Sequence, residues 1–162
     1  MQILYQGNQK FHFTISRNLD YEIHLQNSLE LIFLQEGTCH FHCGSADGWL
    51  QPGQFLAVFP NQIHSFDSSR QVRAFLLIVP AQPFLAAYAD TLFRMVPERP
   101  CLETGPLQPL LEMMEADAKT ASEPVLQGYM QVLIGKVLAL HCEEDLSLAE
   151  IAQEAGVSRQ GV

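Results

Sequence analysis

The sequence predicts an α+β fold in which a small β-barrel is followed by helices. Residues 1–79 hold short apolar segments separated by turn residues, which is typical of strands. After Pro80 the apolar residues recur at helical spacing instead. The chain has 162 residues, of which 48% are hydrophobic, enough for one ordinary globular domain. We therefore expect a barrel over residues 1–80, helices over 81–143 and a third segment over 144–162.

The strands of the barrel are expected from short apolar runs between turn residues, and one of these runs alternates between apolar and polar residues. Phe11, Phe13 and Ile15 alternate with polar residues, which is the period of two of a half-buried strand. Several short strands without helices between them favour a barrel or a sandwich. Further strands are expected at residues 21–25, 29–34, 38–43, 54–59 and 73–79, with turns at 35–37, 44–48, 52–53, 60–61 and 67–70.

Three helices are expected after the barrel, over residues 83–95, 107–119 and 124–141. The last has the clearest periodicity, with two apolar stripes along its length. If one stripe packs within the subunit, the other is expected to contact a second copy in a homodimer. The alternative is that one subunit buries both stripes. The stripe expected at the dimer contact is Leu126, Met130, Leu133, Val137 and Leu140, and the second stripe is Val125, Tyr129 and Val132.

The last 16 residues predict the beginning of a helix-turn-helix. Ser147 can cap a helix whose third position is Glu150, and Gly156 suits the turn that follows it. The second helix of such a unit enters the major groove of DNA. We expect that helix to begin at Ser158, Arg159 and Gln160 and to be cut off after one turn. The alternative is an ordinary helical hairpin.

The charge of the chain argues against nucleic-acid binding by the segment itself. It carries 9 basic and 18 acidic residues, a net charge of −9, and the basic residues are scattered. Phosphate backbones are bound by clustered Lys and Arg, so DNA contact is expected only through the C-terminal domain of the full-length protein. We see no signal peptide, no run of about 20 apolar residues and no disulfide framework. These features predict a cytoplasmic protein without a membrane contact.

Residues 146–159 closely resemble the start of the first helix-turn-helix in AraC/XylS-family transcription regulators. Residues 24–37 and 50–66 resemble the cupin-like barrel (a double-stranded β-helix) of the same family. The resemblance implies a barrel that binds a small-molecule effector, a helical dimerisation element and DNA-binding helices. It implies neither an enzyme nor a cofactor. A third possibility is a structural dimerisation module whose barrel is filled by side chains.

The barrel segment also follows the spacing of the two motifs of metal-dependent cupins. The metal positions of those motifs correspond to His24, Gln26, Glu30 and His64. His24 and Gln26 share a strand face, and Glu30 and His64 are expected on adjacent strands. Because Gln26 stands where those cupins have a second His, we predict that no metal is bound and that the four residues line an effector pocket. The alternative role of the four residues is a hydrogen-bonded structural network or simple exposure. The alternative function is a metal-dependent dioxygenase or isomerase with His24, Glu30 and His64 as ligands.

Two further features have mainly structural interpretations. On the strand from Cys39 to Cys43, His40 and His42 face one way while the cysteines and Phe41 face the other. A metal site that uses both sets is therefore not expected. Arg17 is a candidate partner for an acidic effector, since a guanidinium binds a carboxylate through two hydrogen bonds. The alternative for Arg17 is an exposed position on a strand.

Overall fold

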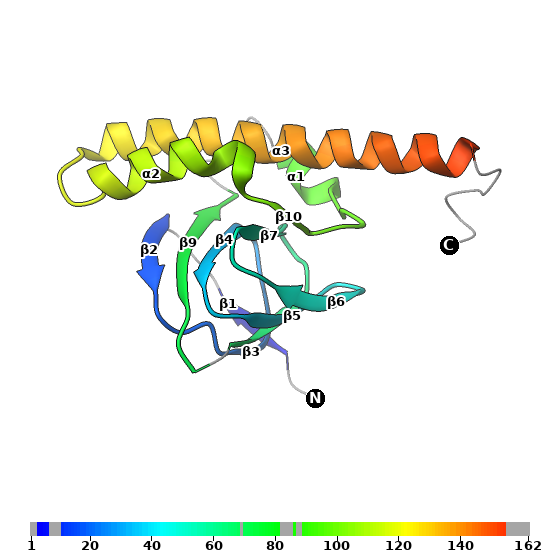
Figure 1. Ribbon diagram of the computed structural model, residues 1–162, viewed down its shortest axis with the longest axis horizontal. Helices are drawn as coiled ribbons and strands as arrows, with labels where there is room; N and C mark the ends of the chain where they lie inside the picture. Colours follow the sequence, from blue (N-terminus) through cyan, green and yellow to red (C-terminus); the bar gives the residue numbers. More distant parts are fainter. Residues whose placement is uncertain (1–2, 7–10, 69, 82–85, 87–88, 155–162) are drawn as a thin grey trace. The chain divides into compact units, whose positions relative to one another are not determined.

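The computed structural model (Figure 1) describes residues 3–6, 11–68, 70–81, 86 and 89–154, with only the backbone given at 89 and over 144–154. The chain divides into two compact units, Met1–Thr104 and Gly105–Val162. The expected boundary near residue 80 lies inside the first unit. A short strand at residues 101–103 pairs with a barrel strand and keeps residues up to 104 in that unit.

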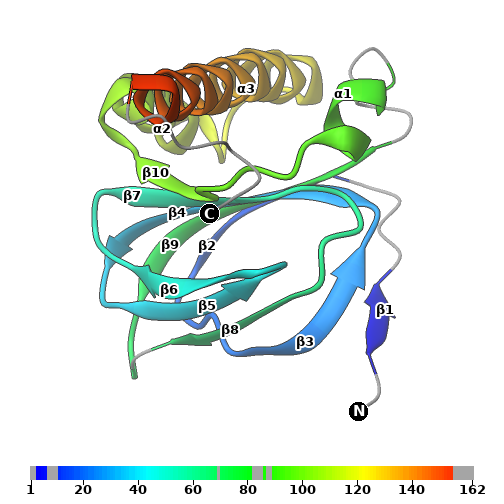
Figure 2. The same cartoon turned by 90° about the vertical axis from the view of Figure 1, so that its right-hand side faces the viewer.

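Two five-stranded sheets face each other in the first unit (Figure 2). All neighbouring strands run antiparallel except β1 and β3, which are parallel. The first sheet has the order β1 (Leu4–Gln6), β3 (Tyr21–Gln26), β8 (His64–Ser68), β5 (Cys39–Cys43), β6 (Ala46–Leu50). The second has the order β10 (Cys101–Glu103), β7 (Gln54–Val58), β4 (Ser28–Glu36), β9 (Arg73–Pro80), β2 (His12–Ser16).

The core is an apolar cluster to which both sheets contribute. Phe41 and Phe66 come from the first sheet, and Ile32, Leu56 and Val58 come from the second. Each large apolar side chain removed from water stabilises the fold by about 1.5–3 kcal/mol. The expected α+β fold with a cupin-like barrel is confirmed, and the expected strands at 21–25, 29–34, 38–43, 54–59 and 73–79 all form with small changes at their ends.

Several strands occur where the sequence analysis predicted turns or gave no assignment. Strand β6 covers most of the expected turn at 44–48, which shrinks to Gly44 and Ser45. Gly44 has a φ of +59°, a backbone conformation that glycine adopts without strain because it has no Cβ. Strand β8 includes Asp67 and Ser68, where a turn was expected, and the Ser68 amide and hydroxyl both donate to Asp20. Strands β1 and β10 were also not predicted.

Each of the three helices expected after the barrel has a counterpart among the described residues, with different bounds. Helix α1 (Ala89–Arg94) is the described part of the first predicted helix. The second unit holds a 3-10 turn, η2 (Gly105–Leu107), then α2 (Gln108–Asp117) and α3 (Glu123–Glu154). The Tyr129 hydroxyl donates to the Asp117 carboxylate and joins α3 to the end of α2.

Helix α3 runs without a break through the place where a new helix was expected to begin. The expected end near His141 and the expected cap at Ser147 are therefore wrong in this structure. The segment between them contains no Gly or Pro that would end a helix. The expected turn around Gly156 and the residues Ser158, Arg159 and Gln160 lie outside the described residues.

The stripe assigned to the dimer contact is largely buried in the single chain. Met130, Leu133 and Val137 are at most 1% exposed, and Leu126 and Leu140 are half-buried. The second stripe is more open, with Val125 44% and Val132 50% exposed and Tyr129 half-buried. The second stripe is therefore the more accessible apolar surface of α3.

Part of α3 is long and apolar enough, by length and composition alone, to cross a membrane. This part is Glu123–Glu143, with a mean hydropathy of 1.2. A core helix of a water-soluble protein meets the same criterion, and here one face of the helix is buried while Lys136 is exposed.

Candidate functional site

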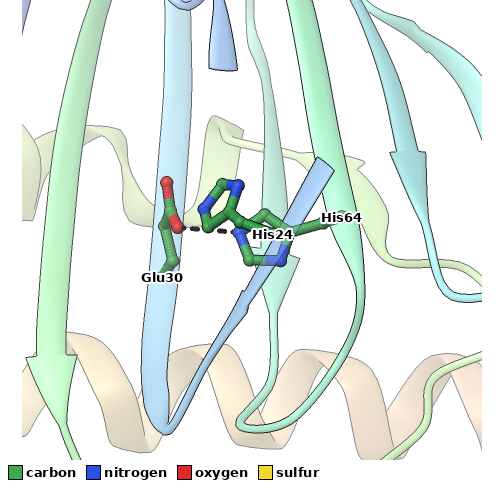
Figure 3. A group of neighbouring side chains, drawn as sticks. All are labelled: His24, Glu30 and His64. Atoms are coloured by element: carbon green, nitrogen blue, oxygen red, sulfur yellow. Dashed lines mark hydrogen bonds and ion pairs between the residues drawn. The ribbon is translucent and has the colours of Figure 1, made fainter. Parts of the chain in front are cut away.

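Four polar side chains are buried together between the two sheets. His24 and Gln26 come from β3, Glu30 from β4 and His64 from β8, and each is at most 4% exposed. The Gln26 amide donates to Glu30 Oε2 at 2.5 Å, and His64 Nε2 lies 3.2 Å from the same oxygen. The rings of His24 and His64 pack with their centroids 4.0 Å apart (Figure 3). We call these four residues the inner cluster.

The local folding of β3 and β4 places these residues. His24 and Gln26 are two residues apart on β3, so both point to the same face, as expected. His24 is opposite His64 in the register of β3 and β8. Glu30, however, is on the other sheet, since β4 pairs with β7 and β9 rather than with β3. The expectation that Glu30 and His64 lie on adjacent strands is wrong, and the cluster instead connects the two sheets.

Two main-chain carbonyls orient the histidine rings. His24 Nδ1 lies 2.7 Å from the Glu22 carbonyl, and His64 Nδ1 lies 2.8 Å from the Gln62 carbonyl. A carbonyl oxygen only accepts hydrogen bonds, so each Nδ1 is assigned the proton. In a neutral ring, Nε2 then carries a lone pair and faces the cluster.

The contact between His64 and Glu30 therefore needs a positive charge or a proton between the two groups. A lone pair on His64 Nε2 and an ionised Glu30 carboxylate cannot bond to each other, because both only accept. Either this pair holds one proton in addition to the proton on His64 Nδ1, or a cation binds to both His64 Nε2 and the Glu30 carboxylate. Without such a proton or cation, the lone pair and the carboxylate would face each other and lower the stability of the fold, since both side chains are almost fully buried.

His24 is kept neutral by its surroundings. Burial lowers the pKa of His24, because the charged ring loses its hydration, and the neighbouring His64 lowers it further. The Glu22 carbonyl and the Glu30 carboxylate act in the opposite direction on this pKa. The net shift is downward, so the neutral ring with its Nε2 lone pair is favoured at pH 7.

This arrangement has the donor chemistry of a divalent transition-metal site. One ligand atom from each of His24, Glu30 and His64 lies within 4.8 Å of the other two. Two imidazoles and a carboxylate suit such metals, and carbonyls that fix the opposite ring nitrogens are typical of metal-binding histidines. Gln26 is placed as a donor to Glu30 rather than as a fourth ligand. Without a metal, the same atoms can bind a ligand that donates hydrogen bonds.

The structure does not bring Arg17 into this cluster. Arg17 is exposed on the connection after β2, and its carbonyl accepts a hydrogen bond from the Val72 amide. Sequence analysis did not identify Glu22 and Gln62, whose carbonyls orient the two histidines. No sequence signal could have identified them, because every residue carries a main-chain carbonyl.

Comparisons with known proteins place these observations in a family. The family model described as "AraC-like ligand binding domain" matches residues 3–133. No curated protein matches the chain. Among solved structures, ToxT from Vibrio cholerae is similar over 94% of this chain and 73% of its own, with 13% identity and a TM-score of 0.49.

A second group of similar structures is oxalate decarboxylase from Bacillus subtilis. One mutant form of that enzyme is 12% identical, with a TM-score of 0.37 over 50% of this chain. The matched part covers only 28% of the oxalate decarboxylase chain.

Proposed function

The chain belongs to the family of AraC-like ligand-binding domains, and we propose that it senses a small-molecule effector at the inner cluster on behalf of a DNA-binding transcription regulator. The observation that carries this proposal is the nearly complete burial of His24, Gln26, Glu30 and His64 among apolar core residues. A few converging polar groups in an otherwise apolar interior are typical of ligand sites. Burial of such groups costs stability, so a binding role accounts for their presence.

The atoms of the cluster select the chemistry of the effector. The Nε2 atoms of both histidines and the Glu30 carboxylate are all acceptors when Nδ1 carries the ring proton. A hydroxyl-rich or amine ligand supplies the missing donors, whereas a carboxylate would be repelled by Glu30. Arg17, the predicted partner for an acidic effector, is exposed. We therefore expect a neutral polyol or a cationic effector rather than an organic acid.

A thermal-shift screen of sugars, polyols, amines and carboxylic acids tests this proposal. A ligand that binds only the folded state raises the melting temperature, and at 100 times its Kd it contributes about 2.7 kcal/mol. The variant Glu30→Gln should lose that shift, and Asp47→Asn, at an exposed carboxylate, should retain it. A shift of equal size in Glu30→Gln would place the effector elsewhere and refute the assignment.

A second candidate is metal binding at the same residues, as in a metal-dependent cupin dioxygenase or isomerase. It is favoured by the convergence of the ligand atoms of His24, Glu30 and His64 and by the carbonyls that hold both Nδ1 atoms. A metal ion would act as a Lewis acid there and would replace the proton between His64 and Glu30. Elemental analysis of the purified chain, with His64→Gln as the matched variant, decides between the candidates. One equivalent of metal that is lost in the variant supports this second candidate, and its absence from the wild-type chain refutes it.

We also propose that the chain forms a homodimer through the exposed stripe of α3. This stripe contains Val125, Tyr129 and Val132. The other stripe, which contains Met130 and Leu133, is already buried. Sedimentation equilibrium of Val132→Asp should show a monomer. The control Met113→Asp changes a side chain that is 54% exposed on α2 and should leave the dimer intact. Equal association of both variants would refute this contact.

DNA contact and a cytoplasmic location complete the proposal. The net charge of −9 argues that the barrel does not bind DNA itself. We assign DNA contact instead to a C-terminal helix-turn-helix. The end of this chain, up to Ser158, Arg159 and Gln160, resembles the beginning of such a unit. The cysteines that the structure describes are all free thiols, which suits a reducing compartment. Gel-shift assays of the full-length regulator, with and without residues 144 onward, test this division of roles.

A further inference from the structure

We propose that the outward face of the β5–β6 hairpin binds a divalent transition-metal ion through His40, His42 and Asp47. We call these three residues the outer cluster. The proposal concerns a second site, independent of the effector site proposed above. The two sites lie on opposite faces of the first sheet, because Cys39, Phe41 and Cys43 alternate with the two histidines and point into the core.

Asp47 contacts both histidines of the outer cluster. His40 Nε2 lies 2.9 Å from one carboxylate oxygen of Asp47, and His42 Nδ1 lies 3.4 Å from the other. Around a tetrahedral ion with bonds of 2.0–2.2 Å, neighbouring ligand atoms lie roughly 3.4 Å apart. The two contacts to Asp47 are close to that size, and the imidazoles of His40 and His42 have to turn toward each other to complete the set. An ion would replace the hydrogen bond that now joins His40 to Asp47.

The strand geometry explains why these side chains meet. His40 and His42 are two residues apart on β5, so they share a face at a spacing of about 6.8 Å along the strand. Asp47 is directly opposite His42 in the β5–β6 register and contacts both rings. Two imidazoles and a carboxylate form a donor set suited to copper, nickel or zinc.

The surroundings favour a cation and leave the donors accessible. The side chains of His40, His42 and Asp47 are 38%, 43% and 58% exposed, so an ion can reach them and the rings can turn to meet it. On β8, Asp67 is opposite His40 and exposed, and it adds a second negative charge on this face. Ser65 is opposite His42 on the same strand.

Trp49 provides a site-specific reporter for this ion. It is the only tryptophan of the chain, it is opposite His40 in the register, and its ring centroid lies 5.0 Å from that of His40. Copper(II) and nickel(II) quench nearby tryptophan fluorescence. Titration of the whole chain with either ion therefore reports on the outer cluster directly.

The expected result is saturable quenching of Trp49 by one equivalent of copper(II), with weaker binding of nickel(II). The double variant His40→Gln/His42→Gln should bind at least tenfold more weakly. The control His12→Gln removes an exposed histidine from β2 in the other sheet and should leave the titration unchanged. Glu30→Gln should also leave it unchanged, which separates this result from any metal at the inner cluster.

Proton competition gives a second readout that needs no variant. Imidazoles bind metal only in their neutral form, so protons compete with the ion and binding should be weaker at pH 5.5 than at pH 7.5. Quenching that rises linearly without saturation in the wild-type chain would overturn the proposal. Equal affinity in the wild type and the double histidine variant would also overturn it.

Discussion

Two histidines and a carboxylate meet on each side of the first sheet, and on the inner side the carboxylate comes from the second sheet. The inner cluster has His24, His64 and Glu30 together with Gln26, and the outer cluster has His40, His42 and Asp47. The two clusters are separated only by the thickness of the sheet, since β5 carries the outer histidines and its neighbour β8 carries His64. Inner side chains are at most 4% exposed, whereas outer ones are at least 38% exposed.

Environment, rather than residue type, decides what two histidines and a carboxylate can do. The inner cluster draws residues from both sheets, and main-chain carbonyls fix its rings. The outer cluster is held by one hairpin and is open to water on one side. Charges interact strongly where water is excluded and weakly where it screens them. The inner cluster should therefore affect stability strongly, and the outer cluster should not.

The largest expected effect tests whether the two faces of β5 are assigned correctly. Cys39 and Cys43 flank the outer histidines in sequence but are buried, and burial raises their pKa values to about 11 and about 12. Their reactive thiolate is therefore scarce at pH 8. Iodoacetamide should label exposed Cys142 at least ~100-fold faster than either, as measured by peptide mass spectrometry. Labelling in urea, where all sites react, is the control, and rapid native labelling of Cys39 would contradict the assignment.

Removal of the carboxylate from each cluster should give the next largest difference. Glu30→Ala leaves Gln26 and His64 buried without their shared acceptor, which should cost about 3 kcal/mol in the free energy of unfolding. Asp47→Ala removes contacts that water can replace and should produce no measurable change. Urea unfolding of both variants measures the difference. Equal destabilisation would mean that the inner contacts add nothing beyond those of a surface pair.

The pattern of short apolar runs predicted the strands, and the resemblance to cupins predicted the barrel and the members of the inner cluster. Alternation located β2, and short apolar runs between turn residues located β3, β4, β5, β7 and β9. The correspondence of His24, Gln26, Glu30 and His64 with the cupin metal motifs brought these four residues together correctly. Their origin in two sheets could not be predicted, because spacing along a chain does not state which strands pair. Strands β6 and β8 were missed because Gly48, Asp67 and Ser68 are residues that also favour turns.

Helix α3 shows a different limit of sequence reasoning. Its two apolar stripes were recognised, but periodicity alone does not tell which stripe is buried, and Met130 proved to be on the buried one. The predicted break before Ser147 relied on a capping pattern. Capping residues permit a helix to begin but do not end the helix that precedes them, and no Gly or Pro separates His141 from Ser147.

The smallest expected effect is the change of stability with pH. The pKa of His24 determines whether stability rises or falls as the pH is lowered. Its pKa is lowered in the folded chain, mainly by burial, while in the unfolded chain it has the ordinary value near 6.5. The contribution of neutral His24 to the free energy of unfolding is therefore complete above about pH 6.5. As the pH falls below that value, the unfolded chain binds the proton first, and stability decreases by less than about 1.4 kcal/mol per pH unit.

His24→Asn keeps a donor near the Nδ1 position for the Glu22 carbonyl but cannot titrate, so its stability should depend less on pH between 5 and 6.5. The matched variant His42→Asn, on the exposed face, should keep the slope of the wild type. Urea unfolding across this range measures all three slopes. If His42→Asn flattened the profile and His24→Asn did not, the outer cluster would be the one that links protonation to folding, and the contrast between the two faces of the sheet would be reversed.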